Sequence, residues 1–178
     1  EEVPVRLPSE CLTGDALGSL RCDCRDQLTT PLKTVAGMER GIVLYLRQEG
    51  RGIGLLNKMK AYQLQDFGYD TVEANEALGF RDDERDYAIA AHMLSSLEVR
   101  SVCLITNNPK KIKDLGRHGT DVVGRIPVAI PPNVHNERYL RTKMAKSGHM
   151  LDDLFHPGEE MVTDGAVGKG TTGQERRA

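Results

Sequence analysis

Three of the four cysteines in this chain lie close together in the sequence, at Cys11, Cys22 and Cys24. Three thiolates form a soft ligand set that suits zinc, with each sulfur about 2.3 Å from the metal. No further Cys or His lies nearby, and three protein ligands with one open position are typical of catalytic rather than structural zinc. Small buried apolar side chains are the alternative interpretation, but charged residues interleave the cluster, which favours a metal site.

A glycine-rich segment, Arg47-Gln-Glu-Gly-Arg-Gly-Ile-Gly54, follows a short apolar run and precedes a predicted helix. Glycines allow a loop to turn its backbone N–H groups toward a ligand, and the N-terminus of the following helix favours an anion. The pattern matches neither of the common phosphate-loop fingerprints. An ordinary tight turn would use the same glycines, so phosphate binding and a plain turn both remain open here.

A second loop, Thr106-Asn-Asn-Pro-Lys-Lys111, has the same placement between a predicted strand and a predicted helix. Lysines in the first turn of a helix oppose its dipole, which suggests an anion that they meet, although a solvated helix face is the alternative. Ligands of open α/β sheets bind at the carboxyl ends of the strands, so the two loops support each other. The charged run Arg81-Asp-Asp-Glu-Arg-Asp86, taken alone, resembles an ordinary helix start.

The elements that must position these residues alternate between strand and helix, which predicts an α/β layer architecture. Apolar runs with β-branched residues predict buried strands, and helical spacing of apolar residues predicts helices. A proline at position 31 is expected to bend or break the first helix. The predicted strands cover residues 3–7, 42–46, 99–105, 122–123 and 128–130; the predicted helices cover 25–39, 55–66, 83–97, 109–118 and 136–147; residues 69–75 are expected to form a polar connection.

Composition narrows the class of protein. The 178 residues suit one domain, with a disordered tail expected from the Gly-rich, polar composition of residues 158–178. The 24 Lys and Arg and 26 Asp and Glu leave a net charge of −2, so there is no broad basic surface for nucleic acid or an anionic membrane. No apolar run approaches the ~20 residues of a membrane span, and the first residues are acidic where a secretory signal is basic. A cytoplasmic protein is therefore expected.

Taken together, these segments closely resemble GTP cyclohydrolase II, the enzyme that opens riboflavin biosynthesis. The resemblance extends from about Arg6 to about Leu151 and is carried by SECLTGDALGSLRCDC, RQEGRGIGLLNKMKAYQLQDFGYDTVEAN, LGFRDDERDY and LITNNPKK. It implies a zinc-dependent hydrolase that converts GTP to 2,5-diamino-6-(5-phosphoribosylamino)pyrimidin-4(3H)-one with release of formate and pyrophosphate. It also implies one Zn²⁺ per chain, Mg²⁺ with the triphosphate, and a homodimer.

The same resemblance implies a single α/β domain over residues 1–157, with a mixed β-sheet flanked by helices and with the first strands of the family missing. It assigns roles to individual residues. Cys11, Cys22 and Cys24 match the zinc ligands. Asp83 matches the proposed proton acceptor, Arg85 the residue proposed to attack the α-phosphorus, and Tyr62 a tyrosine associated with completing deformylation. The positions that match GTP-binding residues are Arg6, Ser9, Glu10, Gln27, Glu49, Gly50, Arg51, Thr71, Thr106 and Lys111.

The chemistry of arginine leaves an alternative role for Arg85 open, and two departures from the family pattern leave alternative functions open. A guanidinium is protonated at neutral pH, so Arg85 is better suited to clamp the triphosphate than to act as a nucleophile. Pro8 stands where the family has His, and Arg25 where it has Gly. The alternatives are a zinc- and nucleotide-binding homologue that does not turn GTP over, and a variant that stops at the formamidopyrimidine for a specialised pathway.

Overall fold

The computed structural model describes residues 1–151 and residue 155. Its centre is a four-stranded sheet in the order β2-β1-β3-β4, and every pairing among these strands is parallel. The strands are β1 (Val3–Arg6), β2 (Ile42–Val43), β3 (Ser101–Ile105) and β4 (Asp121–Ile126). The expected α/β fold with flanking helices is therefore confirmed, but within the described residues the sheet is parallel rather than mixed.

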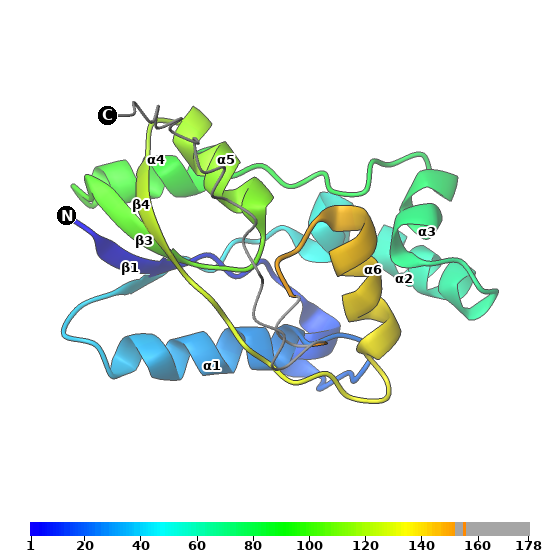
Figure 1. The fold of residues 1–178 in the computed structure, drawn as a ribbon. Coiled ribbons are helices and arrows are strands. Elements are labelled where there is room, and N and C mark those ends of the chain that lie inside the picture. Colours follow the sequence, from blue (N-terminus) through cyan, green and yellow to red (C-terminus); the bar gives the residue numbers. More distant parts are fainter. Residues whose placement is uncertain (152–154, 156–178) are drawn as a thin grey trace, which may run out of the picture.

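Helices cover both faces of this sheet. Figure 1 shows α1 along one face and α4 and α5 along the other, while α2, α3 and α6 gather to one side. Such crossovers are what parallel neighbours require, because the chain must return to the same end of the sheet before each new strand. The helices are α1 (Cys24–Ala36), α2 (Gly54–Asp66), α3 (Thr71–Ala77), α4 (Ala88–Ser96), α5 (Pro109–Arg117) and α6 (Glu137–Ser147), with short helical turns η1 (Leu12–Ala16) and η2 (Glu49–Gly52).

The core lies between the sheet and α4. Val102 and Leu104 of β3 are fully buried, as expected for a central parallel strand that is covered on both faces. They pack in one cluster with Ala90 and Leu94, which the helical spacing of the sequence places on the inner face of α4. Because all four strands point the same way, the loops that follow them meet at a single edge, where the sequence motifs lie.

Pro8 explains why the strand expected over 42–46 is short. The Leu44 N–H donates to the Arg6 carbonyl over 2.9 Å, and the Leu46 N–H donates to the Pro8 carbonyl, also over 2.9 Å. In a parallel ladder the N–H of residue 8 would bond the Leu44 carbonyl, but proline has no N–H to donate. Regular pairing therefore stops after Val43 and resumes as an isolated bridge between Ser9 and Leu46.

Three other local predictions were wrong. The expected connection at 69–75 contains α3, whose start is a capping box: Asp70 accepts hydrogen bonds from the N–H groups of Val72 and Glu73, while the Glu73 carboxylate accepts from the Asp70 N–H. The helix expected from residue 83 begins only at Ala88, because the charged run before it is a loop. Residues 128–130 form no strand; their side chains instead extend the apolar cluster around Ile105.

Pro31 lies inside α1 without ending it. Its missing N–H leaves the Gln27 carbonyl without its helical partner four residues on. That carbonyl accepts a hydrogen bond of 3.1 Å from Nη2 of Arg6 instead. The predicted break is thus absent, and the free acceptor is satisfied by a side chain from β1.

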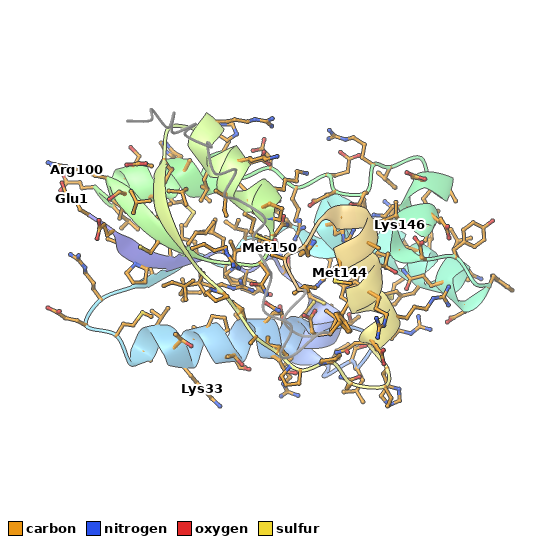
Figure 2. The ribbon with its side chains drawn as sticks, viewed as in Figure 1. Glu1, Lys33, Arg100, Met144, Lys146 and Met150 are labelled. Carbon is orange, nitrogen blue, oxygen red and sulfur yellow. The ribbon has the colours of Figure 1, made fainter. Side chains whose placement is uncertain are left out.

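The chain after β4 returns to the loop edge through α6. Lys146 on α6 forms ion pairs with Asp70 and Glu73 at the start of α3 (Figure 2). Beyond the helix, the Met150 N–H donates to the Asn107 carbonyl over 2.9 Å. These contacts hold α6 close to the loops that follow β2 and β3. The tail predicted over 158–178 lies outside the described residues, and no described helix has the length and apolar character needed to cross a membrane.

Candidate active site and metal centre

The three clustered cysteines converge at the loop edge of the sheet. Cys11 precedes η1, and Cys24 is the first residue of α1. All three Sγ atoms lie within 4.8 Å of one another, and those of Cys11 and Cys22 are 3.8 Å apart. Sulfurs that each bind one tetrahedral metal at about 2.3 Å are themselves about 3.8 Å apart. The observed spacing therefore fits a single tetrahedral metal ion with three thiolate ligands.

Gly14 makes room for this arrangement. A Cβ at this position would lie 2.9 Å from the Sγ of Cys22, 3.1 Å from that of Cys11 and 2.8 Å from the Cβ of Cys24. The Gly14 N–H also points at the Cys11 sulfur, over 3.4 Å. A side chain here would occupy the space between the sulfurs, so the site requires glycine for steric reasons.

The three cysteines differ in acidity. Hydrogen bonds from the other two thiols, together with the Lys58 ammonium, lower the pKa of Cys11 well below its usual range. The same hydrogen bond to Cys11 raises the pKa of Cys22 to about 11, and the pKa of Cys24 also rises for this reason. A metal that binds all three sulfurs must therefore displace protons from the cluster.

Two adjoining clefts surround the cluster. The cavity volume of each is about 110 Å³. The predicted residues that line the first are Ser9, Glu10, Cys11, Cys22, Cys24, Glu49, Gly50, Arg51, Tyr62, Thr71 and Arg85. Those that line the second are Arg6, Ser9, Cys24, Gln27, Arg51, Thr106 and Arg85. Of the sixteen predicted residues, only Asp83 and Lys111 line neither cleft. Asp83 pairs instead with Arg85, and Lys111 donates to the Leu7 carbonyl.

The glycine-rich loop forms η2 and turns through left-handed backbone conformations. Gly50 has φ of 63° and Arg51 has φ of 60°. A residue other than Gly adopts this backbone conformation at a cost in free energy. The Arg51 guanidinium pairs with Asp82 through Nη1. Its Nη2 is buried and has no hydrogen-bond partner among the described residues. This group is available to a ligand between the clefts. Arg47, by contrast, is exposed to solvent.

A chain of hydrogen bonds orients Arg6 and Gln27. Nη2 of Arg6 donates to Oε1 of Gln27 over 2.7 Å, and Nε2 of Gln27 donates to Oδ2 of Asp23 over 3.0 Å. The other oxygen of Asp23 accepts from Nζ of Lys143 on α6, at 3.1 Å. Asp23 is 2% exposed and lies between Cys22 and Cys24 in the sequence. It therefore determines which way the Gln27 amide faces.

Positive charge accumulates beneath the second cleft. The Arg85 guanidinium donates to both oxygens of Asp83, at 2.8 and 2.7 Å. Burial alone would raise the pKa of Asp83, but Arg85 and Lys110 hold it well below its usual range. Lys111 donates to the Leu7 carbonyl over 2.6 Å, and burial followed by the nearby Arg6 and Arg85 lowers its pKa. Asp83 therefore pairs with Arg85 and lies near Lys110, whereas Lys111 donates to a backbone carbonyl; an anionic ligand here would stabilise the charged form of Lys111.

Comparison with known sequences identifies the family of the chain. The sequence model of the GTP cyclohydrolase II family matches residues 1–127. The chain belongs to the GTP cyclohydrolase II family. A GTP cyclohydrolase-2 of Tolumonas auensis is 60% identical over 151 residues, covering 85% of this chain and 77% of that protein. A GTP cyclohydrolase-2 of Azotobacter vinelandii is 56% identical over 161 residues, covering 90% of this chain and 77% of that protein.

The family also includes longer chains. The riboflavin biosynthesis protein RibBA of Synechocystis sp. is 60% identical over 151 residues, which are 85% of this chain and 27% of that protein. The chain therefore spans about a quarter of that relative and about three quarters of the two GTP cyclohydrolase-2 relatives.

Helix α6 and the segment that follows it add cleft residues that the sequence patterns did not reveal. Tyr139 lines both clefts, and Lys143 and His149 line the second, although the match to the family model ends before them. Their spacing is ordinary for a surface helix, so only the folded arrangement identifies them. Lys58, whose ammonium contacts Cys11, was likewise missed, because its position in α2 gives no signal of proximity to a cysteine 47 residues earlier.

Replacing Gly14 with Ala should abolish metal binding, because the added methyl group would occupy the centre of the sulfur cluster. Gly116→Ala is the matched control, since a Cβ there meets no atom within 4 Å. Elemental analysis of purified protein should give close to one zinc per chain for the native and control proteins and far less for Gly14→Ala. Full zinc occupancy in folded Gly14→Ala would contradict this account of the site.

His149 should make the folded protein sensitive to mild acid. Burial and the nearby Lys143 and Arg51 lower its pKa from 6.5 to about 3, so it stays neutral in the folded state while the unfolded chain takes up a proton below about pH 6.5. Between pH 7 and pH 5 this should cost about 2 kcal/mol of unfolding free energy. Urea unfolding at both pH values should show a smaller loss for His149→Asn than for the native chain. Equal losses would refute the assignment.

Proposed function

We propose that this protein is a zinc-dependent GTP cyclohydrolase II that converts GTP to 2,5-diamino-6-(5-phosphoribosylamino)pyrimidin-4(3H)-one, with release of formate and pyrophosphate. The observation that carries the proposal is the junction of the two clefts at Cys24, Arg51 and Arg85. A three-sulfur cluster with space for a fourth ligand lies on one side, and a cation-lined anion site lies on the other. A nucleoside triphosphate has the two chemically distinct ends that such a pair of sites would receive.

Cys11, Cys22 and Cys24 would hold the zinc. Zinc bound there would supply Lewis-acid activation of water for hydrolysis at C8 of the purine. Tyr62 and Thr71 line the same cleft and are proposed to contact the base and the formyl group. Burial raises the pKa of Tyr62, so its hydroxyl remains protonated at neutral pH and can donate a hydrogen bond while formate is lost.

The triphosphate would lie in the second cleft. Arg6 and Gln27 are oriented there by the hydrogen bonds described above, and Thr106 lies just before the N-terminus of α5. Lys111 would add positive charge from behind. Among the described residues, the cysteines form the only cluster of three or more potential metal ligands of the His, Cys, Asp and Glu types. We therefore propose that Mg²⁺ is held chiefly by the phosphates, as is common for this ion.

Arg85 is proposed to bind and polarise the α-phosphate rather than to attack it. Its pKa is raised above the usual arginine value: burial alone would lower it, but Tyr87 and Asp83 outweigh that effect. A permanent guanidinium stabilises developing negative charge on phosphate oxygens. Asp83, with its lowered pKa, is a weak base, so its main contribution would be to hold Arg85 in place. The family resemblance further supports a cytoplasmic homodimer.

Purified protein incubated with GTP and Mg²⁺ should release formate and pyrophosphate. Mass spectrometry should find the deformylated diaminopyrimidinone, and a retained formyl group would instead identify the variant that stops at the formamidopyrimidine. Cys22→Ser should lose ring opening, because the metal would lose one of three ligands. Absence of both small products from protein shown to contain zinc would refute the proposed function.

A zinc- and nucleotide-binding protein that does not turn GTP over is a second candidate, favoured by Pro8. This residue lines the second cleft at a position where the family has an imidazole, and the proline also removes a hydrogen-bond donor. If this candidate holds, calorimetry will detect GTP binding without formate release, and Pro8→His will restore formate release. An active native protein whose turnover is unchanged by Pro8→His would exclude it.

A further inference from the structure

The ammonium group of Lys58 is buried against the sulfur cluster. Lys58 belongs to α2 and is 8% exposed. Its Nζ lies 3.0 Å from Sγ of Cys11, 2.8 Å from Oγ1 of Thr13 and 2.8 Å from Oε1 of Glu49. An ammonium has three hydrogens to donate, and each one has an acceptor here. One of the three acceptors is a metal-ligand sulfur.

The surroundings of Lys58 fix this contact. The Glu49 carboxylate is also 8% exposed, and it accepts hydrogen bonds from the backbone N–H groups of Leu12, at 2.6 Å, and Gly50, at 2.9 Å. Gly50 also lies against the Lys58 stem, since a Cβ at position 50 would be 3.1 Å from the Cβ of Lys58. The carboxylate is therefore held by backbone groups, and the ammonium is held between it and the sulfur.

We propose that Lys58 is a positioning residue of the metal centre, whose ammonium donates a hydrogen bond to the Cys11 ligand and reduces the electron donation of that sulfur to the bound metal. This inference rests on the proposed zinc site. Three thiolates and a divalent ion sum to one negative charge, and an adjacent ammonium offsets it. A sulfur that shares its electrons with an N–H donor leaves more positive charge on the metal, which keeps it a stronger Lewis acid.

A purely structural role would look different. If Lys58 only neutralised the buried Glu49, the ion pair between them would be sufficient and the sulfur contact would have no consequence. The two roles separate when both charges are removed together, because that change relieves the unpaired carboxylate but still leaves Cys11 without its donor. Glu49→Gln alone removes the carboxylate charge while keeping the ammonium beside the sulfur.

Cobalt substitution gives a direct readout of the sulfur. Loading the protein with Co²⁺ should produce a sulfur-to-cobalt charge-transfer band. In Lys58→Met and in Lys58→Met/Glu49→Gln this band should move to lower energy, because a sulfur without a hydrogen bond gives up its electron more easily. Lys60→Met, on the same helix but exposed, is the matched control and should resemble the native protein.

The outcomes separate the inference from the function on which it rests. A shifted band in both Lys58 variants, with an unshifted band in Glu49→Gln and Lys60→Met, would support the role of the ammonium. A native band in the double variant would show that Lys58 merely balances Glu49 and would overturn the inference, while leaving the zinc site intact. Failure of the native protein to bind Co²⁺ or Zn²⁺ at all would overturn both. The double variant leaves no unpaired buried charge, so the test does not depend on the folding of Lys58→Met.

Discussion

At the edge of the sheet that carries the second cleft, cationic side chains withdrawn from water outnumber the carboxylates, and the site is organised around this constraint. Arg6, Arg85 and Lys111 are all withdrawn from water there, while Asp83 pairs with Arg85 and the other buried carboxylate, Asp23, pairs with Lys143. Desolvating a cation is costly unless an anion or several acceptors surround it. Backbone carbonyls partly take the place of anions here. Those of Ile105 and Gln27 accept hydrogen bonds from Arg6, and that of Leu7 accepts one from Lys111. A polyanion bound at this edge would offset part of the remaining desolvation cost.

The sulfur cluster next to this cleft would have the opposite charge balance with a metal bound. Three thiolates and a divalent ion would leave one negative charge, and the ion pair of Lys58 with Glu49 adds no net charge. Under the proposed function, opposite fields in the two halves of the site would orient a ligand that has a polar base at one end and phosphates at the other, before any individual hydrogen bond forms.

Much of this site was predictable from the sequence, because its residues follow strands. The cysteines, the glycine-rich loop and the Thr106 loop occupy the carboxyl ends of parallel strands, where topology brings them together regardless of detail. The start of α3 was also encoded, since Asp70 and Glu73 have capping-box spacing, but the polar composition of that segment resembled a connection. Lys58 and Lys143 could not be predicted: each contacts a residue more than forty positions away, and helical periodicity carries no information about such partners. His149 follows α6 and is brought to the second cleft only by the fold.

Pro31 illustrates how a local defect can serve a distant requirement. A helix-favouring residue in its place would restore the helical hydrogen bond to the Gln27 carbonyl and strengthen α1. The restored bond would compete with Arg6 for that carbonyl, and the Arg6 side chain already has one buried nitrogen, Nε, with no partner among the described residues. In this structure the Gln27 carbonyl therefore bonds to Arg6 and lacks its helical hydrogen bond. Efforts to stabilise this protein through α1 therefore carry a risk to ligand affinity that helix propensities alone do not reveal.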